Sequence, residues 1–336
     1  MRIENAIPGM VLSQDLLDDY GNLLLEKGIT LTEAYINRLK RLGIRTVWVE
    51  DPLAYTLKNE PISPELRTEL ALCIRSLYKI KSNDILTAKL QNLYLRQITK
   101  AANAAIDEIQ EHVPNIINLQ LRHPSIDEVN HAVNVCLLSL VTGIYLKLSR
   151  PLLRDLVVGA LLHDIGKSLV VTDSASNPGF HALCGHEILS NAEQSFSVCR
   201  IAAEHHEKYD GTGYPARIGF KDIHPLARIV AIANYYDNAM QRAGLTGSDR
   251  QDVLEDMMSK GNAAFDLNML RAFFHTVALY PVGTVVRLST GQTGYVIKNY
   301  AHYPLRPVVR TIVSEDFHDI DLLYKPSTTI IEIIKE

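Results

Sequence analysis

Two short stretches of this sequence combine residue types that bind metal ions. In the first, residues 203–215, the adjacent residues His205 and His206 precede the run Asp-Gly-Thr-Gly-Tyr-Pro. On a helix, adjacent side chains point about 100° apart, so this pair could hold two neighbouring metal ions, whereas structural histidines gain nothing from adjacency. The glycine-rich run permits unusual backbone angles and should turn sharply, which would return Tyr214 to the histidine pair. An aromatic hydroxyl would then lie beside the metal site.

The second stretch, residues 163–167, reads His-Asp-Ile-Gly-Lys and follows a predicted apolar helix. That helix delivers His163 and Asp164 to its C-terminal end. A carboxylate after such a buried face requires a cation, and the two oxygens of Asp164 could bridge two metals while His163 binds one of them. Gly166 would free the backbone so that Lys167 turns inward.

Together, the two stretches closely resemble the signature motifs of the HD-GYP family, bacterial metal-dependent phosphodiesterases that degrade the second messenger cyclic di-GMP. The resemblance covers roughly residues 125–279. It implies a helical core that binds two divalent transition metals, iron or manganese. The metal ligands that it implies are, in chain order, His131, His163, Asp164, His181, His205 and His206.

His131 lies early on a predicted helix, which a capping box at residues 125–128 begins. A lone histidine there would be a structural residue in most proteins, but its separation of 32 residues from His163 matches the first metal histidine of the family. Asp127 lies four residues earlier on the same helical face, and some family members use a carboxylate there for a third metal.

The chain departs from the family pattern at two site positions. Asn234 stands where the resemblance places an aspartate as the last metal ligand, and a neutral amide oxygen binds such a cation more weakly than a carboxylate does. Asp237, about one turn further, is an alternative ligand. Ala243 stands where the family has an arginine that binds substrate phosphate, and the adjacent Arg242 is its candidate replacement. The connection over residues 168–180 is also shorter than is typical of the family.

The rest of the chain predicts a mainly α fold. Residues 1–55 indicate a small N-terminal α/β module. Residues 56–120 indicate a helical linker or packing region, in which the first helix begins at Ser63-Pro64. Residues 121–280 form the expected HD-GYP helical core. Residues 281–336 alternate strand-like segments with turns and indicate a small C-terminal β appendage.

Composition excludes several classes of function. Of the 336 residues, 47% are hydrophobic, which is ample for a large buried core. The formal net charge of -4 gives no overall basic field, so we expect no nucleic-acid partner. No apolar run reaches the ~20 residues that cross a bilayer, so we expect no membrane helix. The first residues lack a secretory pattern and the cysteines have no paired spacing, so we expect a cytoplasmic protein.

The resemblance therefore implies hydrolysis of cyclic di-GMP to pGpG or GMP. Asp164 and Lys167 would act in catalysis, and Lys167, Tyr214 and Arg242 would bind the substrate. The alternative is a degenerate family member that binds a nucleotide or a protein partner without turnover. The residues at 234 and 243 and the short connection over 168–180 favour it. A third reading is an HD hydrolase of another nucleotide. A homodimer also stays open.

Overall fold

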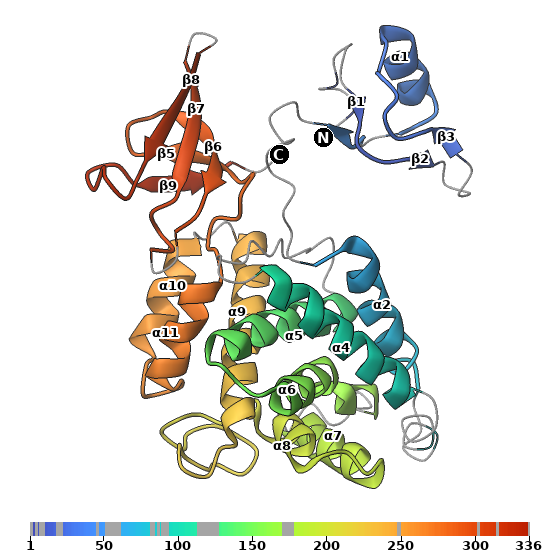
Figure 1. Cartoon of the computed structure of the whole chain (residues 1–336), viewed down its shortest axis with the longest axis vertical. Helices are drawn as coiled ribbons and strands as arrows, with labels where there is room; N and C mark the ends of the chain where they lie inside the picture. Colours follow the sequence, from blue (N-terminus) through green and yellow to red (C-terminus); the bar gives the residue numbers. More distant parts are fainter. Residues whose placement is uncertain are drawn as a thin grey trace.

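The computed structural model describes most of the chain (Figure 1). The described residues are 3, 6, 11–17, 23–44, 47–50, 62–80, 85, 88, 94–112, 128–169, 178–246, 250–300, 303–313 and 316–334.

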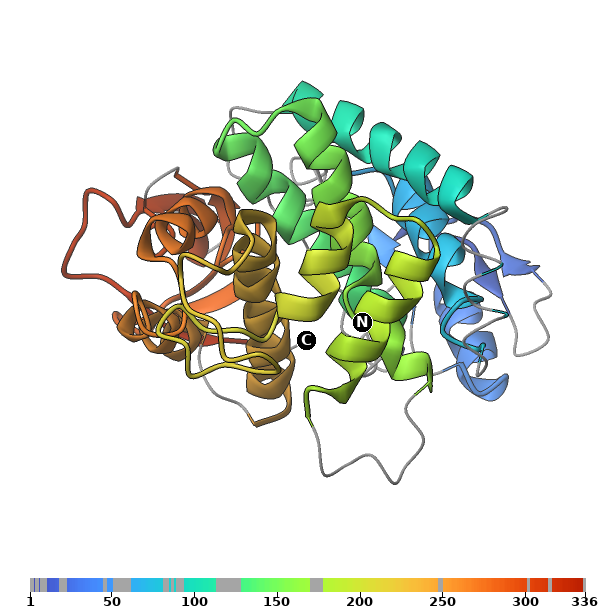
Figure 2. The same ribbon diagram turned by 90° about the horizontal axis from the view of Figure 1, so that it is seen from below.

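The body of the molecule is a bundle of helices around α5, a helix that is buried over most of its length (Figures 1 and 2). Its helices are α2 (Pro64–Arg75), α4 (Leu95–His112), α5 (Glu128–Tyr145), α6 (Arg150–Leu162), η4 (Ile165–Leu169), α7 (Phe180–Asn191), α8 (Phe196–Glu204), α9 (Pro225–Thr246), α10 (Arg250–Ser259) and α11 (Leu267–Thr276). Because α5 packs against α6, α9, α11 and α2, it needs apolar residues on all sides.

Local signals in the sequence account for several helix boundaries. The hydroxyl of Ser63 accepts a hydrogen bond from the backbone N–H of Leu66 at 3.3 Å, and Pro64 occupies the first turn of α2. This confirms the helix start predicted at Ser63-Pro64. Helix α6 ends where the sequence predicts, because His163 is its C-cap residue.

The N-terminal module has its own small hydrophobic core. It contains β1 (Val11–Leu12), β2 (Leu16–Leu17), β3 (Leu23–Leu25), α1 (Glu33–Arg41) and β4 (Val49–Glu50). Strands β1 and β4 pair antiparallel, as do β2 and β3. The buried side chains of Leu12, Leu31 and Val47 belong to a cluster that is separate from the core of the helical body.

The C-terminal part is a five-stranded antiparallel sheet with the strand order β8-β7-β6-β5-β9. Its strands are β5 (Val285–Leu288), β6 (Thr293–Lys298), β7 (Val308–Val313), β8 (Asp316–Asp321) and β9 (Ile330–Ile333). Val286, Val296 and Val309 are buried and join the same hydrophobic cluster as the helices. The sheet therefore packs on the helical body.

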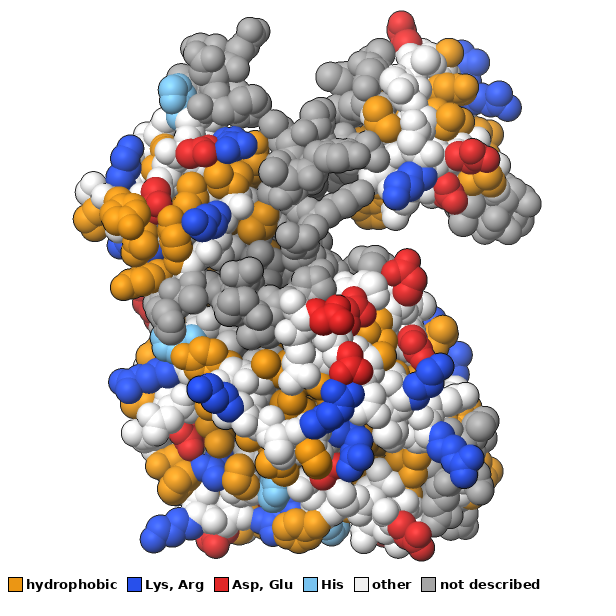
Figure 3. Space-filling model, in the orientation of Figure 1, with side chains coloured by type: hydrophobic (Ala, Val, Ile, Leu, Met, Phe, Trp, Pro, Cys, Tyr) orange, Lys and Arg blue, Asp and Glu red, His pale blue; other side chains and the backbone are white. Residues whose placement is uncertain are grey.

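The predicted fold class, a mainly helical core with a small α/β module before it and a β appendage after it, is confirmed. Among the described helices, none combines the length and the apolar character that a bilayer crossing requires. On the face shown in Figure 3, Lys and Arg side chains are interspersed with Asp and Glu rather than gathered into one patch.

Candidate metal centre and adjoining pocket

Histidines from four helices converge on the carboxylate of Asp164. Oδ2 of Asp164 lies 3.8 Å from Nε2 of His131 and 3.2 Å from Nε2 of His163. Oδ1 lies 3.4 Å from Nε2 of His181 and 3.5 Å from Nε2 of His205. Each oxygen thus faces a different pair of imidazoles, which is the arrangement expected of a carboxylate shared by two cations.

The ligand atoms form two groups that have Asp164 in common. One contains His131, His163 and Asp164, and the other contains Asp164, His181, His205 and His206. Within each group the ligand atoms lie within 4.8 Å of one another. The structure thus brings together all six residues that the sequence singled out as ligands.

The adjacent histidines differ from the sequence prediction. Helix α8 ends at Glu204, so His205 is the C-cap and His206 lies beyond the helix. Helix geometry therefore does not fix the angle between the two side chains. Their ring centroids lie 4.1 Å from each other. Both rings contact His181, and their ligand atoms lie in the group that also contains Asp164 and His181. That the two rings hold two neighbouring metals stays a prediction.

The residues present fit a bound cation. Nε2 of His131, Nε2 of His163 and Oδ1 of Asp164 are buried and have no hydrogen-bond partner among the described residues. Three buried polar atoms without partners would be costly in an apolar interior, whereas a metal ion would satisfy all of them. Nitrogen and carboxylate donors together suit a transition metal.

The electrostatics favour the protonation states that bind metals. Burial lowers the pKa of His163 and of His181 to about 4, although the charge of Asp164 opposes both shifts. Burial also lowers the pKa of His206. Burial alone would raise the pKa of Asp164, but His163 and Lys167 help to hold it well below its usual range. At pH 7 the rings of His163, His181 and His206 are therefore neutral and the carboxylate is ionised.

Lys167 lies directly against the shared carboxylate. Its Nζ donates a hydrogen bond to Oδ2 of Asp164 at 2.5 Å, while 38% of the side chain is exposed. Gly166 serves a purpose that the sequence did not predict. A Cβ on it would lie 2.0 Å from the carbonyl oxygen of His181, and its φ is not positive. The glycine is needed because η4 contacts α7 closely, not because the backbone must turn.

The loop after α8 returns Tyr214 to the histidines, as the sequence predicts. The ring of Tyr214 stacks on that of His206 with centroids 4.6 Å apart. The loop is held by Glu207, whose Oε1 accepts hydrogen bonds from the backbone N–H groups of Ala216 and Arg217 at 2.6 and 3.1 Å. The aromatic hydroxyl therefore comes from a fixed loop beside the second ligand group.

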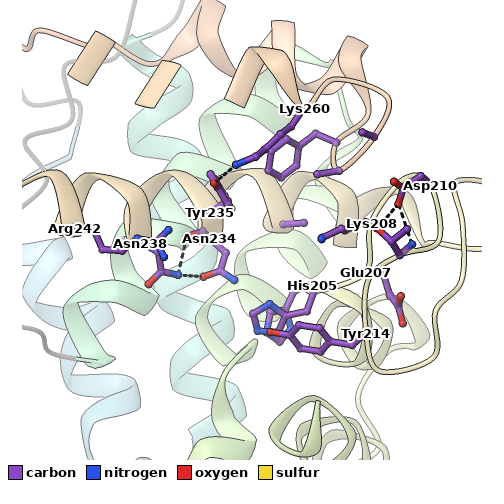
Figure 4. Close-up of a pocket in the computed structure, with 16 residues that line it drawn as sticks. His205, Glu207, Lys208, Asp210, Tyr214, Asn234, Tyr235, Asn238, Arg242 and Lys260 are labelled. Atoms are coloured by element: carbon purple, nitrogen blue, oxygen red, sulfur yellow. Dashed lines mark hydrogen bonds between the residues drawn. The ribbon is translucent and has the colours of Figure 1, made fainter. Parts of the chain in front are cut away.

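A pocket of about 440 Å³ lies between this loop and helix α9 (Figure 4). His205, His206 and Tyr214 form one wall, and α9 forms the other through Asn234 and Tyr235. Two of the candidate ligands, His205 and His206, thus line a cavity within the size range of small-molecule sites.

Comparison with known proteins agrees with the arrangement of histidines around Asp164. The HD domain family matches residues 103–268, and a KOW domain associated with HD domains matches residues 285–336. Both signature motifs meet within the matched HD domain. The chain contains an HD domain of the HD-GYP type.

Two curated relatives carry names that agree with this family. The chain is 29% identical, over 84% of its length and 77% of the relative's, to a cyclic di-GMP phosphodiesterase of Pseudomonas aeruginosa. It is 23% identical to the cyclic di-GMP phosphodiesterase PdeB of Borreliella burgdorferi, over 54% of this chain and 52% of that protein. The chain thus spans about half of the length of the second relative.

A solved structure is also similar. It is described as a HDG"Y"P protein from Bdellovibrio bacteriovorus, with 16% sequence identity and a TM-score of 0.45. The match covers 81% of this chain and 97% of the other.

The two departures from the HD-GYP pattern occupy the α9 wall. Asn234 is buried, and its Oδ1 accepts a hydrogen bond from Nδ2 of Asn238 at 2.7 Å. Arg242 also lines the pocket, but it lies eight residues further, about 12 Å along the helix axis. Its guanidinium carbon is 6.0 Å from the centroid of the Tyr235 ring. Arg242 therefore borders one end of the pocket, and in Figure 4 His205 lies between it and Asp210.

The structure adds residues that sequence reasoning missed. Lys260 lines the same end of the pocket as Arg242, where its Nζ donates to Asp256 at 2.7 Å and to the hydroxyl of Tyr235 at 2.5 Å. The four-residue spacing of Asp256 and Lys260 predicts an ion pair on a helix. No feature of the neighbouring sequence indicates that this pair lies beside the pocket. Asp237 lies behind His131, with its Oδ2 2.6 Å from Nδ1 of that ring, and belongs to neither ligand group.

Three features of the sequence prediction lie outside the described residues. They are Asp127, the side chain of Ala243, and most of the connection over 168–180.

Proposed function

We propose that this chain hydrolyses cyclic di-GMP to pGpG or GMP with two divalent transition metals, iron or manganese, bound around Asp164. The observation that carries the proposal is the division of the Asp164 oxygens between two groups of imidazoles. The two relatives named as cyclic di-GMP phosphodiesterases support the choice of substrate. The proposal also places the protein in the cytoplasm.

The chain's own residues supply distinct functions at this centre. Metals bound there would lower the pKa of a water molecule and offset the charge of a phosphate. Asp164 would hold both, and the imidazoles would complete their coordination. Lys167 would stabilise negative charge that develops on the phosphate or on the leaving oxygen, because its ammonium already lies beside Asp164. Tyr214 would orient the phosphate through its hydroxyl.

The end of the pocket at Arg242 suits the rest of the ligand. A cyclic dinucleotide has a second phosphate, which would face Arg242 when the first lies at the metals. The guanidinium would therefore contribute to binding rather than to the reaction. Asp127 is the proposed ligand of a third metal, and metal analysis that finds three ions per chain would support this role.

The test is an incubation of metal-loaded protein with cyclic di-GMP in which binding, product and metal content are all measured. We expect two transition metals per chain after anaerobic purification and the appearance of linear pGpG or GMP. Asp164→Ala and His205→Ala should abolish the product because each removes a ligand. Metal content near zero under metal-replete conditions would contradict the proposed centre.

Two further variants separate reaction from binding. Lys167→Ala should lower the rate by ~10²-fold or more with metal retained, the size expected when one positioned electrostatic group is removed. Lys221→Ala, which removes a charge from an exposed turn, is its control. Arg242→Ala should mainly weaken substrate binding.

A second candidate function is binding without turnover. The observation that favours it is Asn234, which places a neutral amide on the pocket wall where the family has a carboxylate. Tight binding of cyclic di-GMP with no product, under both iron and manganese, would support this sensor. No binding at all would point to another nucleotide or to a protein partner.

A further inference from the structure

A buried row of polar side chains connects helix α2 to the metal centre. It runs from Arg67 on α2 through Asn134 on α5 and Asp237 on α9 to His131. Nη1 of Arg67 donates to Oδ1 of Asn134 at 3.0 Å, and Nδ2 of Asn134 donates to Oδ1 of Asp237 at 3.0 Å. Oδ2 of Asp237 lies 2.6 Å from Nδ1 of His131.

All four side chains of this row are buried, so a lost hydrogen bond in it would leave a buried polar group without a partner. The relative exposure is 6% for Arg67, 0% for Asn134, 0% for Asp237 and 8% for His131. A guanidinium and a carboxylate at such depth need polar partners, because their desolvation is costly. The amide of Asn134 contacts both, accepting from the guanidinium and donating to the carboxylate, and Nε2 of Gln241 also donates to Oδ2 of Asp237 at 2.7 Å.

The row also fixes the orientation of each member. A guanidinium can only donate, so Arg67 must face the amide oxygen of Asn134, and the amide nitrogen then faces Asp237. The carboxylate in turn accepts the proton on Nδ1 of His131. This leaves the lone pair on Nε2, the atom that lies 3.8 Å from Asp164.

The other histidines are oriented differently. Nδ1 of His163 lies 2.8 Å from the carbonyl oxygen of Ala160, and Nδ1 of His205 lies 3.0 Å from that of Ala202. These rings are thus held by the backbone of their own helices. His131 is held by side chains from α9, α5 and α2, and α2 lies before the matched HD domain, which begins at residue 103.

We propose that Arg67 is a positioning residue for the metal subsite formed by His131, His163 and Asp164. It acts through Asn134 and Asp237 to fix the tautomer and the direction of the His131 ring. This inference rests on the proposed metal centre. It makes α2 a structural part of that centre, and it predicts that one of the two subsites depends on α2 while the other does not.

The experiment compares Arg67→Met with Arg75→Met in the full chain. Arg75 lies on the same helix but is exposed, so both variants remove one positive charge from α2 and only the first interrupts the row. Manganese titration should show about tenfold or greater weakening of one of the two subsites in Arg67→Met, the lower end of the effect usual for residues behind a metal ligand. The second subsite, and both subsites of Arg75→Met, should keep the wild-type affinity.

A second readout does not depend on the metal. Nitrogen NMR of the metal-free protein should show His131 protonated at Nδ1 in the wild type and in Arg75→Met, and a mixture of tautomers in Arg67→Met. If Arg67→Met fails to fold, Arg67→Gln replaces it in both measurements, because glutamine keeps an amide donor without the charge. It should recover the tautomer in part.

The outcomes separate this inference from the proposed function. If the wild type binds no manganese and forms no product, the proposed centre fails. A different result would overturn the inference but not the proposed metal centre. In that result the wild type, Arg67→Met and Arg67→Gln all bind two manganese ions with the same affinity, and the His131 tautomer is unchanged. Equal weakening of both subsites would also overturn it, because Arg67 would then act on the fold as a whole.

Discussion

The ring of Tyr214 lies stacked on that of His206, with centroids 4.6 Å apart and planes inclined by 26°. The backbone N–H of Tyr214 also donates to the carbonyl oxygen of His206 at 3.2 Å. Burial, and then the charge of Asp164, raises the pKa of the Tyr214 hydroxyl. The hydroxyl therefore stays protonated at pH 7 and is a donor beside the metal centre.

Tyr214→Phe tests this donor. The phenyl ring should keep the stacking on His206, so metal content should not change. Turnover of cyclic di-GMP should fall about tenfold, because one hydrogen bond to a charged phosphate is lost. Steady-state kinetics and metal analysis on the same samples are the measurements. Turnover equal to that of the wild type would show that the hydroxyl does not contact the substrate.

Asn234→Asp should tighten metal binding or raise turnover. The new carboxylate adds a negative ligand on the α9 wall and can still accept the hydrogen bond from Asn238. Metal titration and product formation are measured together. Asn238→Asp is the control, because it adds the same charge to the same pocket one turn away. If the two variants behave alike, Asn234 is not in the ligand shell.

Gly166→Ala should destabilise the fold around the metal centre. A Cβ there would lie 2.0 Å from the His181 carbonyl oxygen, a backbone atom, so η4 or α7 must move. We expect a loss of about 1–3 kcal/mol in the free energy of unfolding, the usual cost of overpacking. Gly185→Ala is the matched control, since its Cβ would find no atom closer than 3.5 Å. Urea unfolding followed by circular dichroism compares them, and equal stability would contradict the close approach.

The stability of the metal-free protein should depend on pH in a defined window. Burial holds the pKa of His163 and His181 at about 4, below the ordinary histidine value of 6.5, so the unfolded chain binds more protons between these values. Stability should therefore be highest above pH ~6.5 and fall as the pH drops to ~4, by about 1.4 kcal/mol per pH unit for each proton. Urea unfolding at several pH values measures the slope.

The control for this pH dependence is a double variant, His163→Gln with His181→Gln. Removing both rings should reduce the slope in the same window, and the buried His206, whose pKa is also lowered, should account for part of the slope that remains. An unchanged slope in that variant would assign the effect to other groups.

The sequence alone determined the local parts of the fold. Caps and prolines gave the start of α2 at Ser63-Pro64, because these signals act within one turn of helix. Strand β8 carries only a weak local strand signal, because it reads Asp-Phe-His-Asp-Ile-Asp. It pairs only with β7, and charged residues are typical of such an edge strand, where they discourage further pairing.

The sequence also determined which side chains meet at the site, because the two motifs bring most of them and the family resemblance supplies His131 and His181. Only the tertiary structure decided how they divide. His205 and His206 share one group because α8 ends before them, and Asp237 reaches His131 because α9 packs on α5. These relationships join residues as far as 106 positions apart, and they depend on helix packing that no local spacing encodes.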